Sequence, residues 1–193
     1  SSFERAEALF LKSDMIQRLD CPLVVCAPFV LRHHLATANV RRFENITLHN
    51  APVLDHDDPT KPGPGTAFLC ELFRKRAGTE PLIPEPLLVR LAYYSGGRAR
   101  DFVKLVRKVA DYADAAGRTV ADEEIVEHAI DEERRLLEGG LRKGHIQVLE
   151  EVARDPRHEL PDGAAADELL RTLRLLPYRN KSEWFYPHPL LLI

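Results

Sequence analysis

The chain has 193 residues, a length that one domain or two small ones can share. Its 27 Lys and Arg against 30 Asp and Glu leave a formal charge of −3. This balance argues against a generic DNA-coating protein, which needs a basic excess, although it is compatible with a local basic patch. Apolar residues make up 45% of the chain, which is enough for a packed core and excludes wholesale disorder. No run of about 18 apolar residues occurs, so we expect no transmembrane helix and no membrane partner.

The first half of the chain alternates helices and short apolar strands. The spacing of apolar residues predicts a helix over residues 3–19, and the β-branched run 23–27 predicts a strand that is buried on both faces, as in a parallel sheet. A polar helix over 31–42 and an alternating strand over 45–50 follow. This order indicates an α/β fold that is mainly helical. Two strands cannot complete such a domain, so we expect the rest of the sheet upstream of Ser1.

Cysteine use in this region indicates the compartment. The three cysteines, Cys21, Cys26 and Cys70, are too few and too scattered for a disulfide framework, so we expect a reducing, cytoplasmic location. Cys21 and Cys26, followed by His33 and His34, suggest a metal site, but their spacing is looser than that of zinc sites. We therefore expect the cysteines to be small buried side chains and predict no metal site.

A loop rich in proline and glycine leads to the next helix. Residues 51–66 contain Asp55, Asp57 and Asp58, whose carboxylates are suitable ligands for a divalent cation, but the spaced glycine and glutamate of an EF-hand loop are absent. We therefore favour carboxylates that solvate a flexible loop. Residues 66–77 are expected to form a helix with four inward side chains, namely Phe68, Leu69, Leu72 and Phe73.

Helices dominate the chain from residue 84 onward. Apolar residues at helical spacing predict helices over 84–95, 98–116 and 122–138, and the Gly96-Gly97 pair separates the first two. We interpret residues 81–139 as one helical subdomain.

The C-terminal residues 140–193 combine helices with a hairpin. Apolar residues between 146 and 153 mark one helix, and Asp162 is expected to cap a second helix that runs to Leu176. The apolar stretches 175–179 and 184–186 flank a polar turn. Helices followed by a hairpin predict a small winged-helix domain.

Three passages carry a resemblance to a known family. They are PLVVCAPFVLRHH with NVRRFENITLHNAPV (22–34 and 39–53), YYSGGRARDFVKLVRKVADYA (93–113) and LLPYRNKSEWFYPHPLLL (175–192). In this order they resemble the C-terminal half of a bacterial AAA+ or STAND-type P-loop ATPase with an origin-recognition-like layout. The resemblance implies the distal part of an α/β ATPase core over 1–80, a helical lid over 81–139 and a winged-helix domain over 140–193.

The resemblance also implies roles for four arginines. Arg100 and, with a poorer match in spacing, Arg98 occupy the second-sensor position after a glycine pair, where a guanidinium can donate several hydrogen bonds to a phosphate. The alternative is a solvated arginine that pairs with an acid such as Asp101. Arg41 and Arg42 match a trans-acting arginine finger, or they are exposed arginines favoured by the helix dipole.

The nucleotide-binding half of such an ATPase is missing from the sequence. No G-x-x-x-x-G-K-[ST] loop occurs, and no apolar strand ends in paired acids that would hold Mg²⁺. The first-sensor position reads Cys26-Ala27-Pro28, for which Arg32 is a candidate substitute. We therefore expect the parent protein to be an ATPase that binds ATP and Mg²⁺ through an upstream P-loop region. This chain alone should bind nucleotide poorly and hydrolyse none.

The predicted winged helix offers a contact surface. Its second helix carries Arg171 and Arg174 together with two acids that would repel phosphates, and its wing adds Arg179 and Lys181. We therefore favour a protein or intramolecular contact over DNA. Two hypotheses follow: a fragment of a nucleotide-dependent signalling switch, open to self-association, or a non-enzymatic winged-helix adaptor with a degenerate ATPase remnant.

Overall fold

The computed structural model describes residues 2–12, 18, 20–32, 46–78 and 82–192 of the chain. Helices make up most of these residues, and the strands among them form a two-stranded antiparallel sheet. The predicted mainly helical character is therefore confirmed. None of the helices in this part of the chain is both long and apolar enough to cross a membrane.

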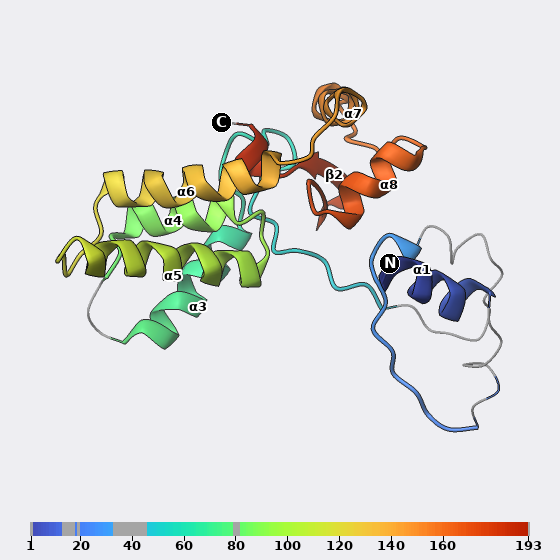
Figure 1. The fold of residues 1–193 in the computed structure, drawn as a ribbon, viewed down its shortest axis with the longest axis horizontal. Coiled ribbons are helices and arrows are strands. Elements are labelled where there is room, and N and C mark those ends of the chain that lie inside the picture. The colour runs from blue at the N-terminus through green and yellow to red at the C-terminus, as the bar shows by residue number, and fades with distance from the viewer. Residues whose placement is uncertain (1, 13–17, 19, 33–45, 79–81, 193) are drawn as a thin grey trace.

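Helices from the middle of the chain form a layer (Figure 1). They are α3 (Gly65–Ala77), α4 (Glu85–Tyr94), α5 (Ala99–Ala115) and α6 (Glu123–Glu138). Each lies where apolar spacing predicted a helix, and α4 contacts the other three. Asp122 caps α6, because its carboxylate accepts a hydrogen bond from the backbone N–H of Ile125 at 3.1 Å. This bond satisfies one of the amides that a helix N-terminus leaves free.

The core of this layer follows the periodicity of the sequence. The inward residues of α5 recur every three or four positions and are buried, namely Phe102, Leu105, Val109 and Ala113. The predicted inward face of α3 is only partly correct. Leu69 is buried there, whereas Phe68 is 60% exposed and Cys70 takes the second buried position. The physical reason is that α3 packs on α4 through one side only, which leaves Phe68 facing solvent.

The described chain ends in two helices and a hairpin. Helices α7 (Lys143–Arg154) and α8 (Ala164–Arg171) precede strands β1 (Leu175–Asn180) and β2 (Ser182–Pro187), and the 3-10 helix η3 (Pro189–Leu191) follows. The strands pair with Leu176 opposite Tyr186 and with Tyr178 opposite Trp184. This is the order of elements that the sequence predicted for residues 140–193.

The second of these helices is shorter than predicted. We expected it to run from Asp162 to Leu176, but α8 begins after Gly163 and ends at Arg171. Leu173 has a φ of 63°, in the left-handed region, through which a right-handed helix does not continue. Arg174 consequently lies outside the helix that was expected to present it.

The N-terminal helices are described only in part. Helical backbone covers α1 (Ser2–Glu7) and the π-helix η1 (Ala8–Lys12), within the predicted helix 3–19. Of the predicted helix 31–42, Leu31 and Arg32 are described and are helical. Its remaining residues lie outside the described part of the chain, and with them the candidate finger residues Arg41 and Arg42.

The predicted strands of a parallel sheet do not form among the described residues. Residues 22–28 and 46–50 are irregular, and Val24 and Leu48 are 96% and 90% exposed. A strand requires a neighbouring strand for its backbone hydrogen bonds. The described residues offer no such neighbour, because their sheet is the hairpin of β1 and β2, whose strands pair with each other.

The cysteines are placed differently from our expectation. Cys21 and Cys26 are exposed, and Cys70 is buried. The first two were expected to be buried because we placed Cys26 in a strand covered on both faces, and that strand is absent. His33 and His34 lie outside the described residues, within which no group of three His, Cys, Asp or Glu side chains could hold a metal ion.

Candidate functional site

The turn between α4 and α5 is the centre of the candidate site. Gly96 and Gly97 both lie in the left-handed region, with φ of 63° and 78°, and Arg98 then returns to an extended backbone before α5 begins. Two consecutive left-handed residues favour glycine, because other residues are strained there. Ser95 closes the turn, since its hydroxyl donates to the carbonyl of Ala92 at 2.7 Å and accepts from the N–H of Gly97 at 3.3 Å.

Two distant segments hold this turn in place. The N–H of Ala51, in the loop before α3, donates to the carbonyl of Gly97 at 2.9 Å. The buried hydroxyl of Tyr178 on β1 donates to the carbonyl of Gly96 at 3.1 Å. A Cβ atom at Gly97 would overlap the carbonyl oxygen of Ala51. The turn is thus the point where the loop, the helical layer and the hairpin are joined.

A cavity of about 190 Å³ lies beside the turn, between the helical layer and the C-terminal elements. Its polar lining comes from α5 and α6 on one side and from the end of the hairpin on the other, and includes Arg98, Asp101, Lys104, Glu133 and His188. The cations and carboxylates that the helical layer contributes are paired with each other. Arg98 forms an ion pair with Asp101, and Lys104 Nζ lies 2.6 Å from Glu133 Oε2.

His188 is neutral in this setting. It is 3% exposed, and burial, together with the nearby charge of Arg98, lowers its pKa to about 3. Its Nδ1 accepts the N–H of Leu190 at 3.2 Å, so the ring proton is on Nε2. Burial also raises the pKa of Asp101, against the opposing effect of Arg98. Both shifts follow from the cost of placing a charge away from water.

The two candidate second-sensor residues are in different environments. Arg98 is engaged by Asp101, as in the alternative that the sequence left open. Arg100, on the first turn of α5, is exposed and forms no hydrogen bond or ion pair with another described residue. Of the two, Arg100 has the guanidinium that is available to an added phosphate.

Arg32, the candidate first sensor, contacts the hairpin of β1 and β2. Its guanidinium forms an ion pair with Glu183 of β2, whose carboxylate also lies 3.1 Å from Nε2 of His49. Among the described residues, no contact links Arg32 to Arg98 or Arg100. The structure therefore separates the two sensor candidates between the hairpin and the Gly96-Gly97 turn.

The basic residues predicted to meet a partner are partly used within the chain. Arg174 donates from Nε to the carbonyl of Leu137 at 2.7 Å and also to that of Gly139, at the C-terminal end of α6. Lys181 pairs with Asp57. Arg171 and Arg179 are exposed. Part of the predicted basic surface is therefore paired within the chain, although the side chain of Lys181 is still 65% exposed.

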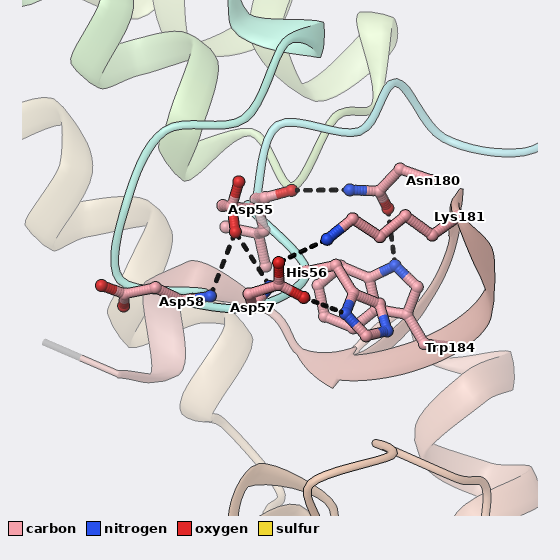
Figure 2. A network of polar contacts seen from close by, with 8 residues as sticks. Asp55, His56, Asp57, Asp58, Asn180, Lys181 and Trp184 are labelled. Carbon is pink, nitrogen blue, oxygen red and sulfur yellow. Dashed lines mark hydrogen bonds and ion pairs between the residues drawn. The ribbon is translucent and has the colours of Figure 1, made fainter.

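The acidic loop is attached to the hairpin, as Figure 2 shows. Asp55 accepts the backbone N–H groups of Asp57 and Asp58 at 2.9 and 3.1 Å, and Asp57 contacts both His56 and Lys181. Hydrogen bonds from Lys61 and Thr60 lower the pKa of Asp58 to about 2. The side chains of Asp57 and Asp58 are 66% and 39% exposed, so these carboxylates face solvent as expected, and they also take partners from the chain itself.

Sequence reasoning missed the residues that join the site together. These residues form hydrogen bonds or ion pairs with partners at least 46 residues away, and no local pattern marks them. They are Ala51, Asp57, Tyr178 and Glu183. His188 lies within the passage 175–192 that was singled out in the sequence, although nothing in that passage indicated the cavity beside it.

Comparisons with protein-family models, with curated proteins and with solved structures found no match to this chain.

Proposed function

We propose that this chain is the C-terminal part of a nucleotide-dependent switch of the AAA+ or STAND type, in which Arg100 senses a nucleotide phosphate. The observation that carries the proposal is the position of Arg100. It follows a Gly-Gly turn, lies on the first turn of α5, and is exposed without a hydrogen bond or ion pair to the described residues. A planar guanidinium at a helix N-terminus suits a phosphate, because both the side chain and the helix end favour negative charge.

ATP and Mg²⁺ would be held by an upstream region of the parent protein. The residues of this chain can supply only part of a nucleotide site, because Arg100 can bind a phosphate but no glycine-rich loop with a lysine occurs in the sequence. We further propose that residues 22–28 and 46–50, which are irregular and expose apolar side chains, pair with strands of that upstream region. This pairing would supply the parallel sheet of the ATPase core.

The same bonds suggest how binding would be transmitted. The turn that carries Arg100 is hydrogen-bonded to Ala51 and to Tyr178. A displacement of α5 toward a phosphate would therefore move the loop and the hairpin with it. In the switch, the helices 81–139 act as a lid and residues 140–193 as a winged-helix module that meets a protein partner, in the cytoplasm.

The test uses the intact protein from its natural reading frame. A G-x-x-x-x-G-K-[ST] loop upstream of Ser1 is the first expectation. Arg100→Ala should then weaken ATP binding or hydrolysis by about tenfold, the usual effect of losing a hydrogen bond to a charged group. Arg107→Ala is the matched control, because Arg107 is exposed two turns further along α5. Equal activity of the two variants would contradict the sensor role.

The second candidate is a non-enzymatic binding module. Arg174 is engaged by carbonyls at the end of α6, and the exposed Lys181 is neutralised by Asp57, which weakens the attraction of this surface for DNA and favours a protein partner. Absence of the upstream loop would favour this module over the switch. Binding to duplex DNA at low salt, weakened in an Arg171→Ala, Arg179→Ala double variant, would identify it as a DNA-binding module instead.

A further inference from the structure

Three separate segments of the chain meet at the carboxylate of Glu183. Arg32 follows the irregular N-terminal segment, His49 lies in the segment before α3, and Glu183 is on β2. Arg32 forms an ion pair with Glu183, and His49 Nε2 lies 3.1 Å from the same carboxylate oxygen. The side chains of Glu183 and His49 are 27% and 12% exposed, so the contact is partly withdrawn from water.

Apolar contacts fix this arrangement. The ring of Phe29 meets Phe185 of β2 and His49 edge-to-face, each at a centroid distance of 6.4 Å. The guanidinium carbon of Arg32 lies 5.8 Å from the centroid of the same Phe29 ring. Val30 is 2% exposed and packs in one cluster with residues of α7, α8 and the hairpin. The segment is therefore docked on the hairpin and held there by more than a surface ion pair.

In this contact, the carboxylate of Glu183 binds the guanidinium of Arg32 as an anion. Burial acts to raise the pKa of Glu183, but its contacts with Arg32 and His49 hold the pKa below its usual value. The carboxylate is therefore ionised near neutral pH. A carboxylate and a phosphate bind a guanidinium through the same planar set of N–H donors, so they compete for it.

We propose that Glu183 is an autoinhibitory counter-ion that occupies Arg32 and keeps it from the nucleotide phosphate. The inference rests on the proposed function, in which Arg32 is the first-sensor candidate. The Arg32 side chain is 42% exposed, but its Nη1 group is held by Glu183, so a phosphate must displace this carboxylate to use the full set of guanidinium donors. The hydroxyl of Tyr178 hydrogen-bonds the same hairpin to the carbonyl of Gly96, so withdrawal of the hairpin would also disturb the turn that precedes Arg100. Glu183 thus favours the resting state over the ATP-bound state.

The test replaces Glu183 in the intact protein. Glu183→Gln removes the charge with almost no change of shape, and Glu151→Gln on α7 is the matched control at an exposed position. Hydrogen exchange without nucleotide should show faster exchange at residues 29–32 in Glu183→Gln alone. ATP affinity should rise by about fivefold, the factor that a partly exposed ion pair of about 1 kcal/mol supplies. The gain should vanish in an Arg32→Ala, Glu183→Gln double variant.

Each outcome decides the inference. Faster exchange with unchanged ATP affinity, in a protein that binds ATP and responds to Arg100→Ala, would overturn the autoinhibitory role and leave the proposed function intact. An affinity gain that persists without Arg32 would also overturn it, because the gain would not act through that residue. An intact protein that binds no ATP would overturn both proposals.

Discussion

Replacing Gly97 with alanine should break the contact between the helical layer and the loop before α3 and destabilise the fold. Gly97 has a φ of 78°, and its carbonyl accepts the N–H of Ala51 at 2.9 Å. An alanine Cβ at this position would lie 3.0 Å from the carbonyl carbon of Ala51 and closer still to its oxygen. Because both contacts are with backbone atoms, neither can be relieved by a change of rotamer, and the loop must shift.

The expected cost has two parts. An alanine held in the left-handed region costs about 1–2 kcal/mol. Shifting Ala51 loses the hydrogen bond between the loop and the turn, worth about 1 kcal/mol. The free energy of unfolding should therefore fall by about 2–3 kcal/mol, which can be measured by urea denaturation followed by circular dichroism.

Gly117 provides the matched control. Its φ of 66° is almost the same, but a Cβ there would meet no atom within 4 Å. Gly117→Ala should therefore cost only the conformational part, about 1–2 kcal/mol. If Gly97→Ala is no more destabilising than Gly117→Ala, the contact with Ala51 does not hold the turn in place, and the turn does not join the loop to the helical layer.

Two further predictions concern the buried His188 and Arg174, which binds the end of α6. The unfolded chain binds a proton at His188 near pH 6.5 and the folded chain only near pH 3, so folding stability should fall as the pH drops through this window. The fall should be at most about 1.4 kcal/mol per pH unit, and His188→Asn should be less sensitive to pH in denaturation experiments. Arg174→Ala should destabilise the fold by about 1–2 kcal/mol, because it leaves the carbonyls of Leu137 and Gly139 without their donor. The exposed Arg179→Ala should cost less than about 0.5 kcal/mol, and thermal unfolding can resolve the difference.

Local patterns were sufficient to locate the helices of the helical layer, but not the end of α8, which stops at Arg171. The spacing of Phe102, Leu105 and Val109 located α5 and its buried face, and Asp122 marked the start of α6. Such features depend on residues within one or two turns of each other. The hairpin was predictable for the same reason, because its two strands are separated by a single short turn.

The predicted strands failed because a strand is completed by another segment. The run Leu23–Ala27 is apolar and β-branched, as in a buried strand, yet Val24 is 96% exposed where no neighbouring strand is available among the described residues. Apolar character establishes that a segment favours burial, but not which partner buries it. The same limit explains Cys26, whose expected burial depended on that strand.

By itself, the sequence determined the helices, the hairpin and the arginines that could bind an anion, because helical periodicity, caps and turns are encoded locally. The pairing of Arg98 with Asp101, three residues away, was an alternative that the sequence itself offered, whereas the tertiary structure alone decided that Arg32 and Arg174 are paired. Asp101 engages Arg98, Glu183 engages Arg32, and α6 carbonyls engage Arg174, whereas Arg100 is exposed and meets no such partner among the described residues. These partners are 3, 151 and 35–37 residues away, and only folding brings the distant ones within hydrogen-bonding distance.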